Sequence, residues 1–180
     1  MSIEALAYPV GKFKAPTGIR AAERAPWIEE LTTAPELLRR AVEHLNDRQL
    51  DTRYRPAGWT VRQVVHHLPD SHLNAYIRYK LALTEDQPKV VSYDEAAWAE
   101  LPEARTGPVA LSVDLLAAVH QRWLASLRGL APEQFERTYL HPEMGVVSLH
   151  YLLALYAWHG RHHVAQITSL ATREGWTTRP

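Results

Sequence analysis

Apolar residues recur at intervals of three and four in four long segments of this chain, which is the spacing that places them on one face of a helix. The four segments cover residues 26–45, 60–84, 109–127 and 148–173. No run shows the strict alternation of apolar and polar residues that a half-buried strand requires. The pattern therefore predicts an all-α protein built on four long helices.

Residues with special backbone properties mark where these helices begin and end. Thr60 is a good N-cap, and Gln63 stands three residues later, as in a capping box. Gly129 and Gly175 follow the third and fourth segments, where glycine commonly ends a helix. Pro35 lies inside the first segment and removes a backbone hydrogen bond, so we expect a kink or a break there.

The connection between the second and third helices, residues 85–108, is polar and dotted with prolines. It is long for a bundle connection, and loops of this length are usually functional or interfacial. At most a short helix is expected around "YDEAAWAEL". We expect the connection to pack over an end of the helical bundle or across a dimer partner, with Trp98 as an anchor.

Two linkers of the chain resemble each other. "LNDRQLDTRYRP" and "LAPEQFERTYLHP" share the order Leu, Gln, acid, Thr, Tyr and Pro, and each lies between an amphipathic helix and a histidine-bearing one. Two such helix-linker-helix halves would pack as a four-helix bundle with approximate two-fold symmetry. The second and fourth helices would then meet across the core. A chance recurrence is the alternative, because the evidence is a single aligned pair.

Composition limits the class of protein. The 180 residues fit one domain, 1–180, whose first ~20 residues we expect to form an extended arm. Lysine plus arginine equals aspartate plus glutamate at 20 each, so neither nucleic acid nor an anionic membrane is an expected partner. No apolar run has the length of a signal peptide or a membrane helix, which predicts a cytoplasmic protein. The absence of cysteine leaves imidazole, carboxylate and water as metal ligands.

Histidine is unusually frequent, with ten in the chain, and three of them stand in "YAWHGRHHVAQI". At ~100° per residue, His159 and His163 lie within ~40° of each other on the helix surface, on the stripe that faces inward. His162 falls on a different face, where a rim position or solvent would suit it. The pair alone is weak evidence of a metal site, because two hydrogen-bonded imidazoles would explain it equally well.

The second helix supplies a third histidine in "TVRQVVHHLPD". His67 lies about 60° from Val64, at the border of the apolar sector, whereas His66 faces away from the core. His67 and the pair on the fourth helix can therefore converge on one ion, with coordination positions left open. Asp70, one turn after His67, could accept from an imidazole N–H, ligate the ion or act as a base, although a solvated carboxylate is nearly as good an interpretation.

Taken together, "GWTVRQVVHHLPDSH" and "YAWHGRHHVAQI" resemble the DinB superfamily, and in particular its YfiT-like branch of metal-dependent hydrolases. The resemblance covers most of the chain, from the first helix to the end. It implies an up-down four-helix bundle with one divalent metal ion, zinc or nickel, held by three histidines. The histidine before Leu-x-Asp corresponds to His67, and the His-x-x-x-His pair corresponds to His159 and His163.

The family also implies a homodimer and a small-molecule substrate, but it leaves the reaction open. Some relatives are similar to transferases that use low-molecular-weight thiols such as bacillithiol. With no cysteine in this chain, a sulfur nucleophile would have to come from such a cosubstrate. A zinc protease of the His-Glu-x-x-His type is excluded, because Gly160 stands where the glutamate base would be.

Three hypotheses follow from these residues. A divalent ion on three neutral imidazoles keeps its double charge, which lowers the pKa of bound water or stabilises a bound thiolate. The leading hypothesis is a metal-dependent hydrolase that activates water against a small molecule. The alternatives are a metal-dependent thiol transferase that acts on electrophiles, and a non-enzymatic bundle that binds metal for stability or senses a ligand.

Overall fold

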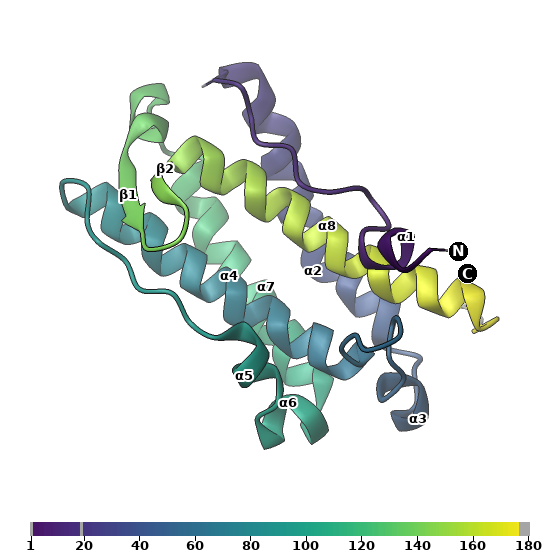
Figure 1. The fold of residues 1–180 in the computed structure, drawn as a ribbon. Helices are drawn as coiled ribbons and strands as arrows, with labels where there is room; N and C mark the ends of the chain where they lie inside the picture. Colours follow the sequence, from purple (N-terminus) through teal and green to yellow (C-terminus); the bar gives the residue numbers. More distant parts are fainter. Residues whose placement is uncertain (1, 19, 177–180) are drawn as a thin grey trace.

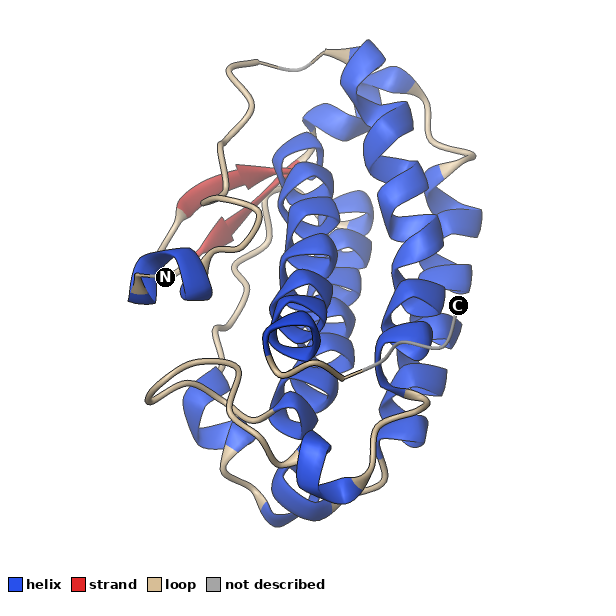
Figure 2. Ribbon diagram, turned by 90° about the vertical axis from the view of Figure 1, so that its right-hand side faces the viewer, coloured by secondary structure: helices blue, strands red, loops and turns tan. Residues whose placement is uncertain are grey.

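The computed structural model describes residues 2–18 and 20–176. Its main feature is a bundle of four long helices (Figure 1 and Figure 2). They are α2 (Arg24–Val42), α4 (Val61–Thr84), α7 (Val109–Leu127) and α8 (Leu149–Arg173). The four-helix bundle predicted from the sequence is therefore confirmed. None of the described helices combines the length and apolar character that a membrane span needs.

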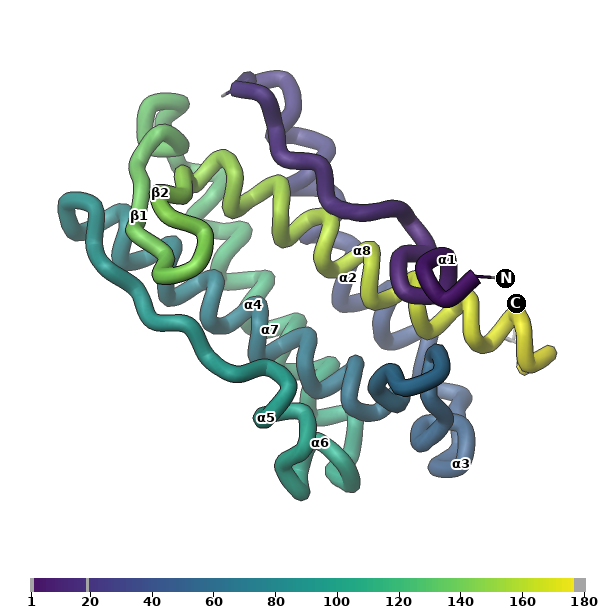
Figure 3. The backbone as a smooth tube through the Cα atoms, in the orientation of Figure 1, coloured from purple at the N-terminus to yellow at the C-terminus, as the bar shows by residue number. Residues whose placement is uncertain are grey.

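The helices are not arranged around the bundle in the order of the sequence. α2 packs against α7 and α8, and α4 packs against the same two helices, so α2 and α4 stand at opposite corners. α4 and α7 run in the same direction, as do α2 and α8 (Figure 3). A simple up-down bundle would instead place consecutive helices side by side and antiparallel. The difference arises because the connection 85–108 runs back along α4 and starts α7 at the end where α4 starts.

The helix boundaries agree with those expected from capping residues. The Thr60 hydroxyl accepts from the N–H of Gln63 at 3.2 Å, and Gln63 Oε1 accepts from the N–H of Thr60 at 2.9 Å, so the capping box is confirmed. Ser148 caps α8 by accepting from the N–H of Tyr151 at 3.1 Å. A break at Pro35 is not found: α2 continues through this buried residue. Packing of the helix on both sides outweighs the missing hydrogen bond.

A short hairpin was not predicted by the hydrophobic pattern. Strands β1 (Thr138–His141) and β2 (Gly145–Ser148) pair in antiparallel register just before α8. Four residues are too few for an alternation of apolar and polar positions to stand out from the neighbouring sequence. Leu140 of β1 also exchanges two backbone hydrogen bonds with the connection, to Pro88 O at 2.9 Å and from the N–H of Val90 at 3.1 Å. The hairpin therefore anchors the connection beside α4.

The connection forms two short helices, α5 (Glu95–Ala99) and α6 (Pro102–Thr106), and both pack against α4. The Gln63 side chain holds α5 by donating to the carbonyl oxygen of Ala99 at 2.7 Å. The expectation that this segment covers an end of the bundle is therefore wrong, because it lies along the side of α4. Trp98 is 40% exposed on the outside of α5.

The N-terminal arm is mostly extended but contains one short helix, α1 (Ile3–Ala7), and it lies against α8 (Figure 1). Two side chains of α8 hold the arm in place through hydrogen bonds to its backbone. Trp158 Nε1 donates to the carbonyl oxygen of Gly11 at 3.1 Å, and Gln166 Nε2 donates to that of Ala7 at 3.0 Å. The arm therefore covers a face of α8 that the helix pattern alone would assign to solvent.

The two similar linkers fold alike at their starts. In α3 (Asp47–Leu50), Gln49 Oε1 accepts from the N–H of Asn46 at 3.0 Å. In η2 (Pro132–Glu136), Gln134 Oε1 accepts from the N–H of Ala131 at 2.9 Å. The parallel pair α2 and α8 also matches the parallel pair α7 and α4, as the predicted two-fold relation requires. α4 and α8 occupy equivalent places and meet across the core.

The apolar core of the bundle has two parts, with a polar layer between them. One part surrounds Trp123 and Tyr79, and the other surrounds Leu38 and Leu68. Between these parts, each long helix except α2 contributes polar side chains that are buried or, for His159, half-buried: His67, His72, His120, His159, His163 and Gln166. Buried polar groups need hydrogen-bond partners, so this layer is the part of the core whose geometry is most constrained.

Candidate metal centre

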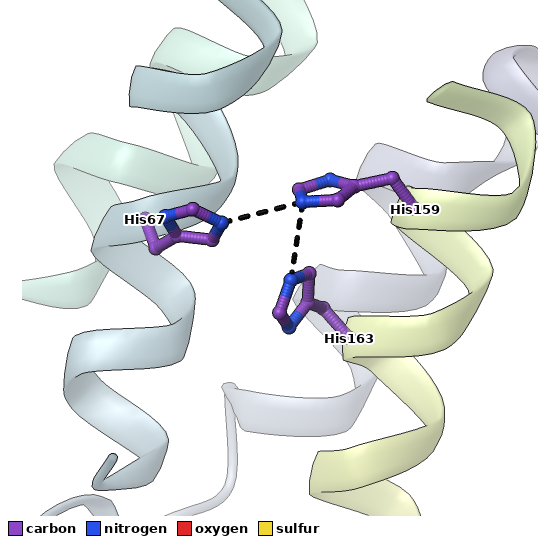
Figure 4. A group of neighbouring side chains, drawn as sticks. All are labelled: His67, His159 and His163. Carbon is purple, nitrogen blue, oxygen red and sulfur yellow. Dashed lines mark hydrogen bonds between the residues drawn. The ribbon is translucent and has the colours of Figure 1, made fainter. Parts of the chain in front are cut away.

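Three imidazoles from two antiparallel helices converge in the polar layer. His67 extends from α4, and His159 and His163 extend from consecutive turns of α8 (Figure 4). His159 Nε2 lies 3.3 Å from His67 Nε2 and 3.2 Å from His163 Nε2. The structure thus brings together the three histidines that helical geometry and the family pattern selected from ten.

Burial keeps these imidazoles neutral. Desolvation, with a smaller effect of His162, lowers the pKa of His67 to about 4. Desolvation also lowers the pKa of His159 and of His163 well below the usual value, and the neighbouring imidazoles add to the effect. A protonated imidazole would lose its water shell here without gaining an anionic partner. The three rings therefore offer uncharged nitrogens at neutral pH.

A chain of hydrogen bonds determines which nitrogen of His159 carries the proton. The carbonyl oxygen of Leu31 can only accept, so His120 Nδ1 donates to it at 2.7 Å. A neutral His120 then accepts at Nε2 from His72 Nδ1, 2.8 Å away. By the same rule, His72 Nε2 accepts from His159 Nδ1 at 3.2 Å. His159 is thereby left with an unprotonated Nε2, which faces the other two rings.

A second set of contacts orients His163 in the same sense. Gln166 Nε2 donates to the carbonyl oxygen of Ala7 at 3.0 Å and to His162 Nε2 at 3.0 Å. Its Oε1 is consequently the atom that faces His163 Nδ1, 2.8 Å away, and it accepts the proton there. His163 Nε2 is therefore unprotonated and, like His159 Nε2, carries a lone pair. This is the arrangement in which a ligating histidine usually holds its outer N–H.

These lone pairs fit a divalent metal ion. With the tautomers above, His159 Nε2 and His163 Nε2 carry no proton between them, so their 3.2 Å contact is not a hydrogen bond. Two zinc–nitrogen bonds of ~2.0–2.1 Å at a tetrahedral angle would separate the nitrogens by about 3.3 Å. A cation held by His159 and His163 would therefore replace the repulsion between their two lone pairs with two coordination bonds. Within residues 2–18 and 20–176, the group has these three members.

A cavity of about 340 Å³ opens beside the three histidines. Its size is in the range of small-molecule sites. α4, α8, the hairpin and the connection all contribute to its wall, with side chains that are mostly polar or aromatic: Trp59, Ser71, Arg78, Tyr93, His141 and Tyr156. Trp59 and Arg78 line this cavity, whereas Trp123 belongs to the apolar core.

Asp70 does not join the three imidazoles. Among the described residues, its carboxylate makes no hydrogen bond to His67, His159 or His163, and it does not line the cavity. Burial, with a smaller effect of Glu103 on α6, raises the pKa of Asp70. The Asp70 carboxylate also acts to raise the pKa of Tyr93, a residue of the cavity wall, so Asp70 lies near the cavity without forming part of its lining. Neither direct ligation nor acceptance from an imidazole is supported by this placement.

His66 and His162, the histidines adjacent to His67 and His163, lie outside the group, but His162 is not at a solvent-facing rim. His66 contacts α7, with Nδ1 2.7 Å from Ser112 Oγ, as expected of a residue that faces away from the centre. His162 is buried, at 5% exposure, and stacks on Trp158 with ring centroids 4.5 Å apart. The expectation for His162 is wrong because the N-terminal arm covers that face of α8; Tyr8 lies 5.7 Å from its ring.

Sequence reasoning missed His72 and His120, which orient His159. Both are almost completely inaccessible, at 0% and 2% exposure. Their positions in the sequence could have identified them, because each lies on the apolar face of its helix, where a buried imidazole needs a hydrogen-bond partner. Their partners are distant in sequence, so no short motif identifies the chain of contacts.

Comparison with known proteins places this geometry in a family. The chain matches the family model of the DinB superfamily over residues 30–167. It is 48% identical over 173 residues to "Putative metal-dependent hydrolase YfiT" of Bacillus subtilis, covering 96% of this chain and 97% of that protein. It is 50% identical over 169 residues to "Putative metal-dependent hydrolase OB0782" of Oceanobacillus iheyensis, covering 94% and 98%.

Solved structures agree with this assignment. The fold is similar to that of YfiT from Bacillus subtilis, described as "a probable metal-dependent hydrolase with an unusual four-helix bundle topology", with a TM-score of 0.93 and 48% identity. That match covers 96% of this chain and 99% of the other. TT2238, a four-helix bundle protein, matches with a TM-score of 0.57 and 17% identity over 81% of this chain and 98% of its own. The second likeness concerns the fold alone.

The burial of His120 predicts a pH dependence of stability. Desolvation lowers its pKa to about 4 in the folded protein, against about 6.5 unfolded, so the unfolded chain binds more protons between these values. The free energy of unfolding should therefore fall as the pH falls from about 6.5 toward 4, by roughly 1.4 kcal/mol per pH unit for this group. Denaturant titrations of metal-free protein at several pH values should show a shallower slope for His120→Leu than for the unchanged protein. Equal slopes would contradict the neutral, buried His120.

The hydrogen-bond chain predicts an effect of His72 on metal affinity. His72→Phe removes the acceptor of His159 Nδ1–H and frees the ring to change tautomer, so zinc should bind ~10–100-fold more weakly. Competition with a chromogenic chelator measures this change. His66→Phe, on the same helix but outside the chain, is the matched control and should bind zinc as before. A folded His72→Phe protein with unchanged affinity would refute the orienting role.

Proposed function

This chain belongs to the DinB superfamily, and on that basis we propose that it is a metal-dependent hydrolase whose divalent ion, zinc or nickel, is held by His67, His159 and His163. When bound there, the ion would supply Lewis acidity, which lowers the pKa of water and polarises a substrate oxygen. The substrate is a small molecule that occupies the adjoining cavity.

The observation that carries the proposal is the combination of three oriented lone pairs with an adjacent cavity. A structural zinc site uses four protein ligands, whereas a catalytic one keeps a position for water or substrate. Here the group has three members within the described chain, and the cavity reaches all three. A site built only for stability would have no need of such an opening, which argues against the non-enzymatic alternative.

Residues of the cavity can bind the substrate and accept protons. Burial raises the pKa of Tyr93 and of Tyr156, so both phenols stay protonated and can donate hydrogen bonds at neutral pH. Glu95 and Glu143 are the carboxylates that line the cavity, whereas Asp70 does not. We therefore assign proton acceptance to these two glutamates in preference to Asp70, which was the expectation from sequence.

A thiol transferase is the second candidate. The same ion would stabilise a thiolate that enters from the cavity, and the chain has no cysteine of its own to serve as the nucleophile. A low-molecular-weight thiol such as bacillithiol would be the cosubstrate. Assays for thiol consumption with an electrophile, run beside assays for ester and amide hydrolysis, separate the two reactions.

We further propose that the protein is a homodimer, as the family resemblance implies. Large apolar side chains are exposed on the connection and on α7, including Trp98 at 40%, Leu101 at 45% and Leu111 at 67%. Aromatic residues of this kind often anchor interfaces. Sedimentation at micromolar concentration should show a dimer, and Trp98→Glu should shift it toward monomer. A monomer under all conditions would contradict this proposal.

The metal site predicts the behaviour of single variants. Purified protein should hold about one divalent ion per chain, and His67→Ala, His159→Ala and His163→Ala should each lose most of it, because two remaining nitrogens bind too weakly. Hydrolysis of any substrate found in a panel of esters and amides should fall in parallel. Elemental analysis and the activity assay measure the two effects.

His66→Ala is the matched control, since His66 is adjacent to His67 but contacts α7 instead. Its metal content and activity should stay close to those of the unchanged protein. Equal metal loss in His66→Ala and His67→Ala would show that the assigned ligands are wrong. Full metal content without any hydrolytic or thiol-transfer activity would favour a non-enzymatic role.

A further inference from the structure

Arg78 is a buried cation in the wall of the cavity. It lies on α4 about three turns after His67, and both side chains line the same space. Only 8% of Arg78 is exposed. A guanidinium cannot lose its charge by deprotonation, so a buried arginine needs partners for its charge and for its five N–H donors.

The recorded partners of Arg78 are few. One terminal nitrogen donates to the carbonyl oxygen of Val91 at 2.9 Å, and the hydroxyl of Tyr156 is a second, neutral hydrogen-bond partner. No carboxylate in the described part of the chain forms an ion pair with Arg78. Arg62, the other buried arginine of α4, shows what a satisfied guanidinium looks like in this protein. It donates to Asp51 at 2.7 Å, to Asp47 at 2.8 Å and to a backbone carbonyl at 3.0 Å. Arg78 lacks the anions that Arg62 has.

The charge of Arg78 is directed toward the cavity. It acts to lower the pKa of His141 and of Tyr156, and both of these residues line that space. Glu95 and Glu143 also line it, but both are exposed and neither reaches Arg78 in an ion pair. The cavity therefore presents a desolvated positive charge without an anionic partner, and the three histidines line the same cavity.

We propose that Arg78 forms a carboxylate subsite, so that the substrate is an anionic small molecule whose carboxylate binds Arg78 while its reacting end lies at His67, His159 and His163. This proposal rests on the proposed function, since it takes the three histidines as the reacting end of the site. The planar fork of N–H groups matches a carboxylate in a bidentate contact, which a lysine could not make. A carboxylate would also supply the missing counter-charge.

The competing explanation is that Arg78 only holds the connection in place through Val91. Arg137 provides a matched control, because it also donates to backbone carbonyls near the end of α4, those of Ala82 and Glu85, and it does not line the cavity. Loss of a structural hydrogen bond to the backbone is thus common to Arg78→Met and Arg137→Met. Loss of a carboxylate site is specific to Arg78→Met.

The test uses cobalt-loaded protein and pairs of thiols that differ in one group. ω-Mercaptocarboxylates of increasing chain length are compared with the corresponding mercaptoamides, and binding is followed by the visible spectrum of the cobalt ion. For the chain length that spans the site, the acid should bind about tenfold or more tightly than the amide, as a charge-assisted bidentate contact implies. Arg78→Met should remove most of this preference, Arg78→Lys should retain part of it, and Arg137→Met should leave it intact.

The outcomes separate this proposal from the proposed function. Equal binding of acids and amides, or a preference that survives in Arg78→Met, would overturn the carboxylate subsite while leaving the open metal position intact. A spectrum that responds to no thiol would count against the open position instead. In that case, NMR on zinc-loaded protein tests whether Arg78 binds a carboxylate. Its Nε–H signal should shift with glutarate and not with glutaramide, and equal responses would overturn the subsite.

Discussion

The arrangement of the centre depends on one chain of hydrogen bonds through the middle of the bundle. It begins at the carbonyl oxygen of Leu31, which can only accept, and passes through His120 and His72 to His159. Each neutral imidazole transmits the direction of donation to the next, so the lone pair of His159 points at His67 and His163. The carbonyl oxygen of Leu31 is freed for this purpose by Pro35, which has no N–H to donate to it within α2. The group of three histidines thus lies at the end of a hydrogen-bond network to which α2, α7 and α4 contribute.

That network explains why the core is divided. A layer of buried imidazoles replaces apolar contacts that would otherwise stabilise the bundle, and each ring must find a partner or cost stability. The two apolar parts of the core, around Trp123 and around Leu68, flank the layer and hold the four helices at a fixed spacing. The hairpin and the connection then close one side of the same region and form the cavity. Rigid packing above and below the layer holds the three imidazoles in position, while the cavity leaves one side of the group accessible.

Residue patterns within a few positions predicted much of this structure. Features that depend on contacts between distant segments of the chain were not predicted. The start of α4, the end of α7 and both ends of α8 follow from capping residues and helix-ending glycines that act within a few positions. The three converging histidines were found because two are four residues apart on α8 and the third borders the apolar sector of α4. The parallel course of α4 and α7 depends on the path of a long connection, and the strand Thr138–His141 is only four residues long. His72 and His120 were missed because their partners lie 87 and 89 residues away, and His162 was misplaced because a separate arm covers it.

The central claim is that three oriented imidazoles hold a divalent ion whose remaining coordination is exchangeable. X-ray absorption at the metal edge of the loaded protein tests it most directly. The spectrum should fit three imidazole nitrogens at ~2.0–2.1 Å together with one or two light atoms, and the light-atom part alone should change when a thiol is added. A site with fewer than three imidazoles, or one completed by a fourth protein ligand that no added thiol displaces, would contradict the account.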